Sequence, residues 1–241
     1  MIPQFLILYF IIYFICTTGK IINNEEEFIE NINKKSESFN IQNKITIEKK
    51  GKIDITSTNF LLIGDSINSE IHMINTDISF DEKCENIEIR NITVNGNLKF
   101  SNNKNIIFNN VNYNGYFISN NKLSDFRPSF NILNSNFTLP EKNHGYDFKN
   151  YNLNIENSKF YGNNIYNLYI IDFLGDGRKY HSFNIKNSFF SGNYHNSGIK
   201  SRYSNFTCQY SRFENLYNGK FSNGYDIILI IKQQFRKNLL F

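Results

Sequence analysis

The chain has 241 residues and a formal net charge of +4, with acidic and basic residues spread along its whole length. This small, dispersed charge argues against a nucleic-acid partner, since nucleic-acid-binding domains usually carry a clustered basic face. The composition includes 42 Asn and 36 Ile, with no Ala and no Trp. Because Ile, Phe and Tyr favour strands and Asn favours tight turns, we expect an all-β chain.

Residues 1–19 have the pattern of a secretory signal peptide. The apolar run 2–15 is followed by Cys16, two threonines and Gly19, and the small residues at 18 and 19 fit a cleavage site. The run is shorter than the roughly 18 apolar residues that span a membrane, which leaves an uncleaved anchor as the alternative. We therefore expect a secreted, extracellular protein with no transmembrane span after cleavage.

Residues 20–52 are expected to form an N-terminal cap. Asn24 precedes three glutamates, a pattern that favours the N-terminus of a helix, and Phe28, Ile29 and Ile32 give that helix an apolar side. A short helix here would cover the first turn of a stacked fold. A loose polar leader is the alternative.

A repeat of about 22 residues fills the rest of the chain, 53–241. Its template reads apolar, x, apolar, x, Asn, small, x, apolar, x, Gly, Asn, as in 153–163 and 183–193. The first, third and eighth positions are apolar in every copy. The copies begin at Ile53, Ile71, Ile87, Ile106, Phe130, Leu153, Phe183, Phe206 and, more weakly, Ile228.

The physics of this template predicts a solenoid. Positions one and three point to the same side of a strand, Asn at position five accepts a left-handed bend, and position eight points inward again. Gly at position ten permits a second bend. A repeat this short cannot bury a core alone, so copies must stack, with Phe137, Phe160 and Phe190 as vertical neighbours and the Asn side chains in an amide ladder.

We therefore predict an all-β, right-handed parallel β-helix of about eight or nine rungs with a short N-terminal capping helix. A leucine-rich-repeat solenoid is the alternative, although such repeats place Asn three residues after the second strand position and this template places it two after. The stacking puts Cys84 and Cys208 about five rungs apart, roughly 24 Å, which is too far for a disulfide. The apolar end 239–241 lacks a polar cap, so we expect a truncated C-terminus or docking on a partner, including end-to-end self-association.

With motifs such as the run 184–193 (NIKNSFFSGN), the chain resembles right-handed parallel β-helix proteins of the pectin-lyase-like superfamily over residues 53–235. It is most similar to Asn-rich secreted members from AT-rich microbial eukaryotes. The resemblance implies either a non-enzymatic surface or adhesive protein or an enzyme that cleaves polysaccharide. Asn75-Thr76-Asp77 matches a fragment of the polygalacturonase pattern, but no Asp-Asp or Gly-His-Gly follows, so we treat that match as coincidence.

Inserted loops on adjacent long rungs supply the candidate site, since function often resides on loops. If these loops leave the solenoid on one side, they form a polar, tyrosine-lined surface. The candidates for ligand contact are Asp125, Arg127, Asp147, Tyr166 and Tyr169, and those for catalysis are Asp172, Asp176 and Arg178. The same loops carry Glu141, His144, Tyr146, Lys179 and His181.

We expect a non-enzymatic secreted or cell-surface β-helix that contacts a polysaccharide or cell-surface glycan. A polysaccharide lyase or glycoside hydrolase is the alternative, as are a plain solvated surface and a degenerate relative with a structural role. No histidine or cysteine has metal-ligand spacing, and no cofactor is indicated. Of the three glycosylation sequons, we expect glycans at the outward-facing Asn136 and Asn205 but not at the ladder residue Asn91.

Overall fold

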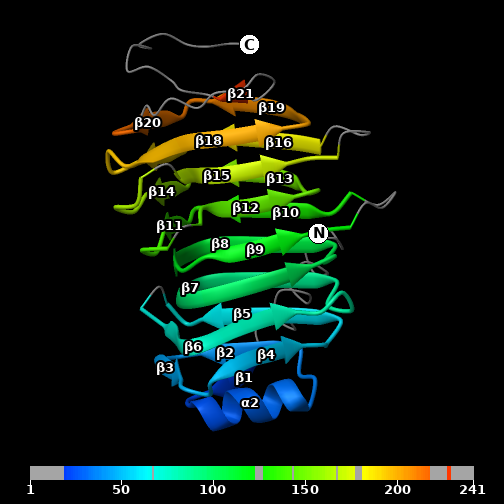
Figure 1. The fold of residues 1–241 in the computed structure, drawn as a ribbon. Coiled ribbons are helices and arrows are strands. Elements are labelled where there is room, and N and C mark those ends of the chain that lie inside the picture. Colours follow the sequence, from blue (N-terminus) through cyan, green and yellow to red (C-terminus); the bar gives the residue numbers. More distant parts are fainter. Residues whose placement is uncertain are drawn as a thin grey trace, which may run out of the picture.

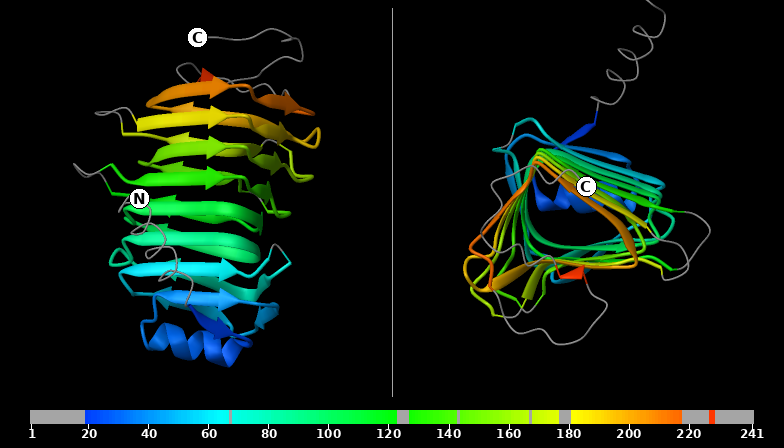
Figure 2. Two further views of the ribbon diagram at one scale, coloured as in Figure 1. Left: turned by 180° about the vertical axis from the view of Figure 1, so that it is seen from behind. Right: turned by 90° about the horizontal axis from the view of Figure 1, so that it is seen from above.

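Three short strands follow one another in each turn of the chain, and about eight such turns stack into a column (Figure 1). The computed structural model describes residues 19–66, 68–122, 127–142, 144–166, 168–176, 181–217 and 227–228. Seen along its axis the coil is roughly triangular, so the column has three β faces (Figure 2). The predicted all-β parallel β-helix is confirmed. Of the expected signal segment 1–19, residues 1–18 lie outside the described residues.

The first face begins each turn, and its strands pair in parallel. It comprises β1 (Lys20–Ile22), β2 (Ser38–Ile41), β5 (Asn59–Gly64), the first part of β7 (Asn86–Ser101), the first part of β8 (Asn105–Asn114), β10 (Ser129–Leu133), β13 (Asn152–Glu156), β16 (His181–Lys186) and β19 (Ser204–Gln209).

The second face follows it around the first corner. It comprises β3 (Lys44–Ile47), the first part of β6 (Glu70–Phe80), the middle of β7, the end of β8, β11 (Asn136–Thr138), β14 (Lys159–Tyr161), β17 (Phe189–Ser191) and β20 (Arg212–Glu214).

The third face closes the turn. It comprises β4 (Gly51–Ile55), the end of β6, the end of β7, β9 (Phe117–Asn120), β12 (Tyr146–Lys149), β15 (Leu168–Leu174), β18 (Asn196–Arg202) and β21 (Ile227–Ile228). We call the turn between the second and third faces the second corner, and the turn between the third face and the next first face the third corner.

Like side chains pile up inside the column, as the template predicts. Phe137 lies 5.0 Å from Phe160, which lies 4.9 Å from Phe190, and both pairs are stacked ring on ring. Phe213 continues the stack at 4.7 Å from Phe190. Because strand side chains alternate, each inward aromatic residue is flanked by outward residues, and the interior is filled by apolar side chains throughout.

Asparagine makes the first corner, where the chain passes from the first to the second face. Asn91, Asn110, Asn134, Asn157 and Asn187 all have φ between 49° and 56°, the left-handed conformation that Asn tolerates well. Part of the predicted amide ladder is present. Asn110 donates to Asn91 Oδ1 at 3.0 Å, and Asn157 donates to Asn134 Oδ1 at 3.3 Å, whereas Asn134 donates to Asn109 instead.

The first two copies of the repeat were placed on the wrong faces. Ile53 opens the third face and Ile71 the second, while the true partner of Ile87 is Phe60. Asn75 is left-handed as predicted but bends the second corner, outside the Asn ladder. The template consists of two inward residues, a bend and a third inward residue. This pattern occurs at more than one corner of a three-sided coil, so the template alone does not identify the face.

The glycines at template position ten serve two different needs. Gly96 has φ +137°, so a second bend requires glycine there, as predicted. Gly115 has no such φ; instead, a Cβ at this position would lie 1.9 Å from the carbonyl oxygen of Gly96 on the turn below. Close approach of two turns, rather than bending, therefore requires glycine at 115.

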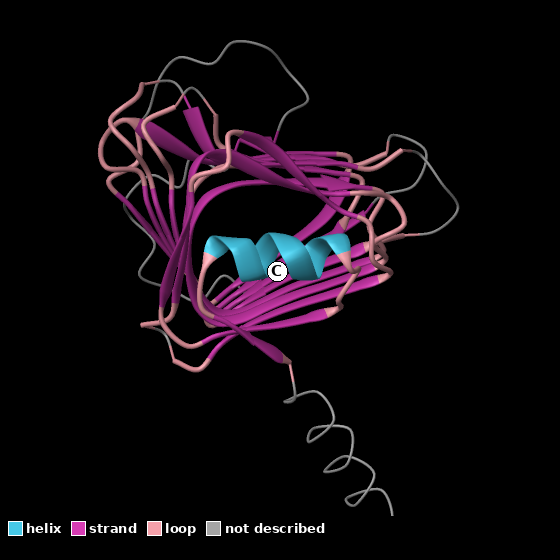
Figure 3. Cartoon of the chain, turned by 90° about the horizontal axis from the view of Figure 1, so that it is seen from below, coloured by secondary structure: helices cyan, strands magenta, loops and turns pink. Residues whose placement is uncertain are grey.

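The predicted helix is α2 (Glu25–Asn33), and it lies across the N-terminal end of the column (Figure 3). The Asn24 side chain accepts a hydrogen bond from the backbone N–H of Glu27 at 2.9 Å, as an N-cap does. Buried Phe28 packs against Phe39 of β2 at 5.4 Å. The first complete turn is β2, β3 and β4, so the solenoid begins at Ser38, inside the segment expected to be cap.

The C-terminal copy departs from the prediction. A ninth copy starting at Ile228 would lie in parallel on Phe206 of the first face. Instead, β21 pairs antiparallel with β18 of the third face. Cys84 and Cys208 are free thiols. Cys84 lies just before β7 and Cys208 lies on β19, so they are separated by five strand pairings, from β7 through β8, β10, β13 and β16 to β19, as the stacking predicted.

Candidate functional site

The inserted loops leave the column at two corners, not on one side as expected. The insertions between β11 and β12 and between β14 and β15 fall at the second corner, whereas those between β9 and β10 and between β15 and β16 fall at the third corner. The third face lies between these two corners, so its outer surface is bordered by inserted loops on both edges.

Two carboxylates lie side by side on the outer surface of the third face. Asp147 of β12 pairs directly with Asp172 of β15, which pairs in turn with Lys200 of β18. Both aspartates are half-buried, between inward residues that are fully buried. Like charges on directly paired strand residues are destabilising, so this arrangement requires compensation.

Two cations from β18 supply part of that compensation. Arg202 Nη2 lies 3.2 Å from Asp172 Oδ1, and both side chains are about one-third exposed. The Lys200 ammonium lies 5.5 Å from the ring centre of Tyr169, within cation–π range. The two carboxylates and the two cations therefore form one mixed-charge cluster, here named the carboxylate cluster: Asp147, Asp172, Lys200 and Arg202.

Asp147 is the electrostatically perturbed member of the carboxylate cluster. Burial, and then the neighbouring Asp172 carboxylate, raise its pKa above the ordinary value for aspartate. His144 and Arg202 oppose this shift without cancelling it. Asp147 is therefore more readily protonated than an exposed aspartate, whereas Asp172 forms an ion pair with Arg202.

The second corner adds a basic and aromatic edge to the carboxylate cluster. The Tyr116 ring lies 5.6 Å from the ring of His144, and the Lys142 ammonium lies 5.4 Å from the Tyr116 ring centre. His144 and Lys142 are exposed. This edge thus carries an imidazole, an ammonium group and an aromatic ring.

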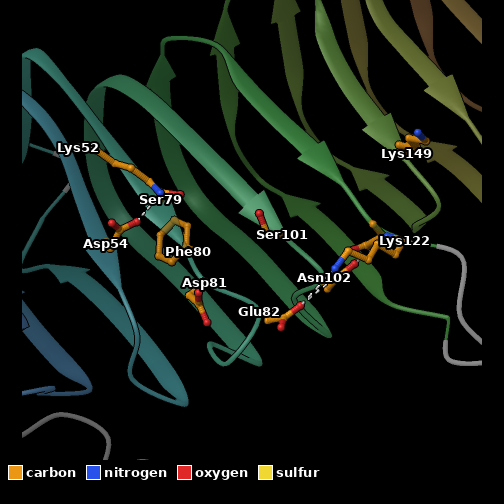
Figure 4. A pocket seen from close by; sticks show the side chains of 11 residues that line it. Lys52, Asp54, Ser79, Phe80, Asp81, Glu82, Ser101, Asn102, Lys122 and Lys149 are labelled. Carbon is orange, nitrogen blue, oxygen red and sulfur yellow. Dashed lines mark hydrogen bonds and ion pairs between the residues drawn. The ribbon is translucent and has the colours of Figure 1, made fainter.

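A polar groove of about 510 Å³ occupies the lower part of the same surface (Figure 4). The small residues Ser79 and Ser101 line it, as does Lys149, which follows Asp147 by two residues on β12. It continues along the strand ends with Lys52, Asp54, Phe80, Asp81, Glu82, Asn102, Asn121 and Lys122. The groove and the carboxylate cluster therefore share β12 and form one continuous polar surface.

The predicted site residues divide between this surface and the third corner. Asp147, Tyr169 and Asp172 come together on the third face, and Tyr166 lies at its second corner. Arg127 and Asp176 lie at the third corner, where both act electrostatically on the buried His181. Asp125, Arg178 and Lys179 lie outside the described residues. Tyr146, expected on the tyrosine-lined surface, is instead fully buried in the core.

Sequence reasoning missed Tyr116, Lys142, Lys200 and Arg202. Lys200 and Arg202 come from a segment that matches no part of the template. They could have been found only by working out which residues of the next turn pair with Asp172 and its neighbours on β15. That register depends on the loop lengths between the faces, which the template does not fix.

The three sequons differ in exposure. Asn136 and Asn205 are exposed on the outer sides of β11 and β19, whereas Asn91 is half-buried and accepts the ladder bond from Asn110. Asn136 also donates its amide to Asn112 Oδ1 at 2.8 Å. Glycan attachment at Asn136 and Asn205 stays a prediction.

Two further observations concern metal ligands and membrane-spanning helices. In the described part of the chain, no three His, Cys, Asp or Glu side chains group closely enough to hold a metal ion. Within the same ranges, no helix is both long and apolar enough to cross a membrane.

No family model matches the sequence, and no curated protein or solved structure is significantly similar to it. The superfamily resemblance therefore stands only as a likeness of repeat pattern. What the structure supports is the coarser statement, a parallel β-solenoid of about eight turns. Any function must be argued from the surface itself.

Proposed function

We propose that this protein is a secreted or cell-surface β-helix that binds a glycan on the outer surface of its third face. The observation that carries the proposal is the gathering of the carboxylate cluster, the polar groove and part-exposed aromatic rings on the outer side of one face. Binding sites for polar ligands combine a concave surface with a few converging polar groups.

The chemistry of that surface suits sugar hydroxyls. The carboxylates of Asp147 and Asp172 accept hydrogen bonds, while Arg202 and Lys149 donate them. Tyr169, half-buried with the Lys200 ammonium over its ring, adds an aromatic contact beside these groups. Charged hydrogen bonds of this kind are stronger than neutral ones and fix orientation.

A glycan array probed with the secreted chain tests the proposal. Arg202→Ala removes a donor beside Asp172 and is expected to weaken binding at least tenfold. Arg212→Ala is the matched control, because Arg212 is an exposed arginine on the second face that pairs with Glu214. Equal binding by the two variants, or binding by neither parent nor variants, rules out the third face as the glycan site.

Hydrolysis of a glycosidic bond is the second candidate, and the pairing of Asp147 with Asp172 favours it. Glycosidases use two carboxyl groups, one protonated as the acid, and the raised pKa of Asp147 suits that role. Neighbouring strands lie about 4.8 Å apart, close to the separation of about 5 Å in enzymes that retain anomeric configuration. Asp176, expected as a catalytic residue, lies at the third corner.

Reducing-end assays on polygalacturonate, xylan and neutral glucans test this candidate. Asp147→Asn and Asp172→Asn are each expected to abolish cleavage. Glu88→Gln is the control, because Glu88 is a carboxylate on the first face, away from the carboxylate cluster and the groove, and pairs with Arg90 at 3.3 Å. No release of sugar by the parent chain excludes hydrolysis and leaves the binding proposal intact.

A further inference from the structure

Three aromatic rings cluster on the solvent side of the second corner. The Tyr166 ring lies 4.3 Å from the ring of His195 and 5.3 Å from the ring of Tyr217. Tyr166 is 57% exposed. These three residues, here named the aromatic platform, come from three successive turns of the solenoid. Exposed clusters of this kind usually mark interaction sites.

Buried amides hold the platform loops in place. Asn196 is fully buried, and its Nδ2 donates to Asn163 Oδ1 at 3.0 Å and to the carbonyl of Ile165 at 2.7 Å. The backbone N–H of Tyr217 donates to the carbonyl of Asn196 at 2.9 Å. One amide network thus fixes the loops carrying all three rings. A rigid aromatic surface binds with little loss of conformational entropy.

The aromatic platform lies in line with the carboxylate cluster along β15. Tyr166 precedes the strand, Tyr169 lies near its start, and Asp172 follows three residues later. At about 3.3 Å per extended residue, the six-residue interval puts Tyr166 at most roughly 20 Å from Asp172. Tyr169, beneath the Lys200 ammonium, lies between them. The features therefore mark an extended path across the third face rather than a single pocket.

Charge balance along this path identifies the kind of ligand. Asp147 and Asp172 are matched by Lys200 and Arg202, and the platform itself consists of uncharged tyrosines and a histidine. A polyanion would meet two carboxylates, and a lipid or apolar peptide would have to desolvate four charges. Flat ring faces bordered by hydrogen-bonding groups suit a neutral sugar chain.

We propose that the third face binds a linear, neutral oligosaccharide along β15, with one sugar ring stacked on the aromatic platform and later rings at the carboxylate cluster. The inference rests on the proposed glycan-binding function and specifies its ligand class and direction. It predicts that affinity grows with chain length until the ligand spans both features.

Calorimetric titration with neutral gluco-, xylo- and chito-oligosaccharides of increasing length tests this on the full secreted chain. Tyr166→Ala is expected to weaken binding of the long oligosaccharides about tenfold, equivalent to about 1.4 kcal/mol, without affecting the shortest. Tyr166→Phe keeps the ring and is expected to bind like the parent. Tyr161→Ala is the matched control, because Tyr161 is a part-exposed tyrosine on the second face. Circular dichroism confirms that each variant is folded.

The outcomes separate the two proposals. If long oligosaccharides bind the parent and Tyr166→Ala equally, the aromatic platform is not part of the binding site. The proposal of glycan binding is then unaffected. Tighter binding of oligogalacturonate than of any neutral chain overturns the assignment of a neutral ligand. An absence of saccharide binding overturns this inference and the proposed function together, whereas length-dependent binding that is lost only in Tyr166→Ala supports both.

Discussion

Phe160 offers the sharpest test of the stacked core. Its side chain is fully buried, stacked between Phe137 at 5.0 Å and Phe190 at 4.9 Å, with Tyr146 at 5.9 Å. Truncating a buried phenylalanine to alanine costs about 3–5 kcal/mol. Because Phe160 loses two stacked partners, we expect Phe160→Ala to cost about 4–5 kcal/mol.

Two further substitutions separate stacking from mere hydrophobicity. Phe213 is only partly buried and has one stacked partner, Phe190 at 4.7 Å, so Phe213→Ala is expected to cost about 1–2 kcal/mol. Phe189 precedes Phe190 on β17 but points outward, so Phe189→Ala is expected to cost under about 1 kcal/mol.

Urea unfolding followed by far-ultraviolet circular dichroism measures all three costs, compared at equal m values. The order expected is Phe160, then Phe213, then Phe189. A cost for Phe160→Ala no larger than that for Phe189→Ala would contradict the inward ladder and, with it, the assignment of faces.

Three other substitutions test the site and the turns. Asp147→Asn is expected to stabilise the fold by about 0.2–1 kcal/mol at pH 7, because it removes a like-charge pair with Asp172; a lower thermal midpoint would contradict this. Burial lowers the pKa of His181, so its neutral form favours folding and that stability is lost as the pH falls through about 6.5. His181→Gln is therefore expected to show a smaller drop in thermal midpoint from pH 7 to 5.5 than the parent, and an equal drop would refute the reasoning. Gly115→Ala is expected to destabilise by several kcal/mol, because its Cβ would lie 1.9 Å from the Gly96 carbonyl oxygen; unchanged urea unfolding would show that the turns can separate there.

The strands and bends could be predicted because each is determined by local chemistry. An inward residue must be apolar, and a left-handed bend favours Asn or Gly, so 153–163 and 183–193 reveal the same structure independently. Register from Ile87 to Phe206 followed correctly. Register before Ile87 did not, because one template fits the second and third faces as well as the first, and only strand pairing distinguishes them.

The candidate site could be predicted only in part. Asp147, Tyr169 and Asp172 were identified as polar residues near insertions, but their grouping depends on the turn-to-turn register, which the lengths of loops 139–145 and 162–167 determine. The same lengths decide at which corner a loop leaves the column. Outward side chains do not have to fit the core, so they follow no repeat. Lys200 and Arg202 of β18 could therefore not be predicted from the template.

The contrast between outer surfaces is the strongest reason to place function on the third face. On the first face, stacked neighbours satisfy one another: Ser129 donates to Asn105 at 2.7 Å, and Thr207 donates to Asn184 at 2.6 Å. Lower on the third face, Asp77 lies 2.7 Å from the Lys99 ammonium. Among the paired strand residues that the structure describes, only Asp147 and Asp172 place two carboxylates directly opposite each other.

A solenoid selected for stability alone would carry an amide or a cation at position 147, since either removes the repulsion at no cost in packing. Asp77→Asn is therefore expected to destabilise the fold, because it breaks an ion pair, whereas Asp147→Asn stabilises it. If Asp147→Asn is at the same time the variant with weaker glycan binding, stability has been given up for recognition at this position. If both variants lose stability alike, Asp147 is an ordinary surface charge. The pairing of Asp147 with Asp172 then no longer supports placing the function on the third face.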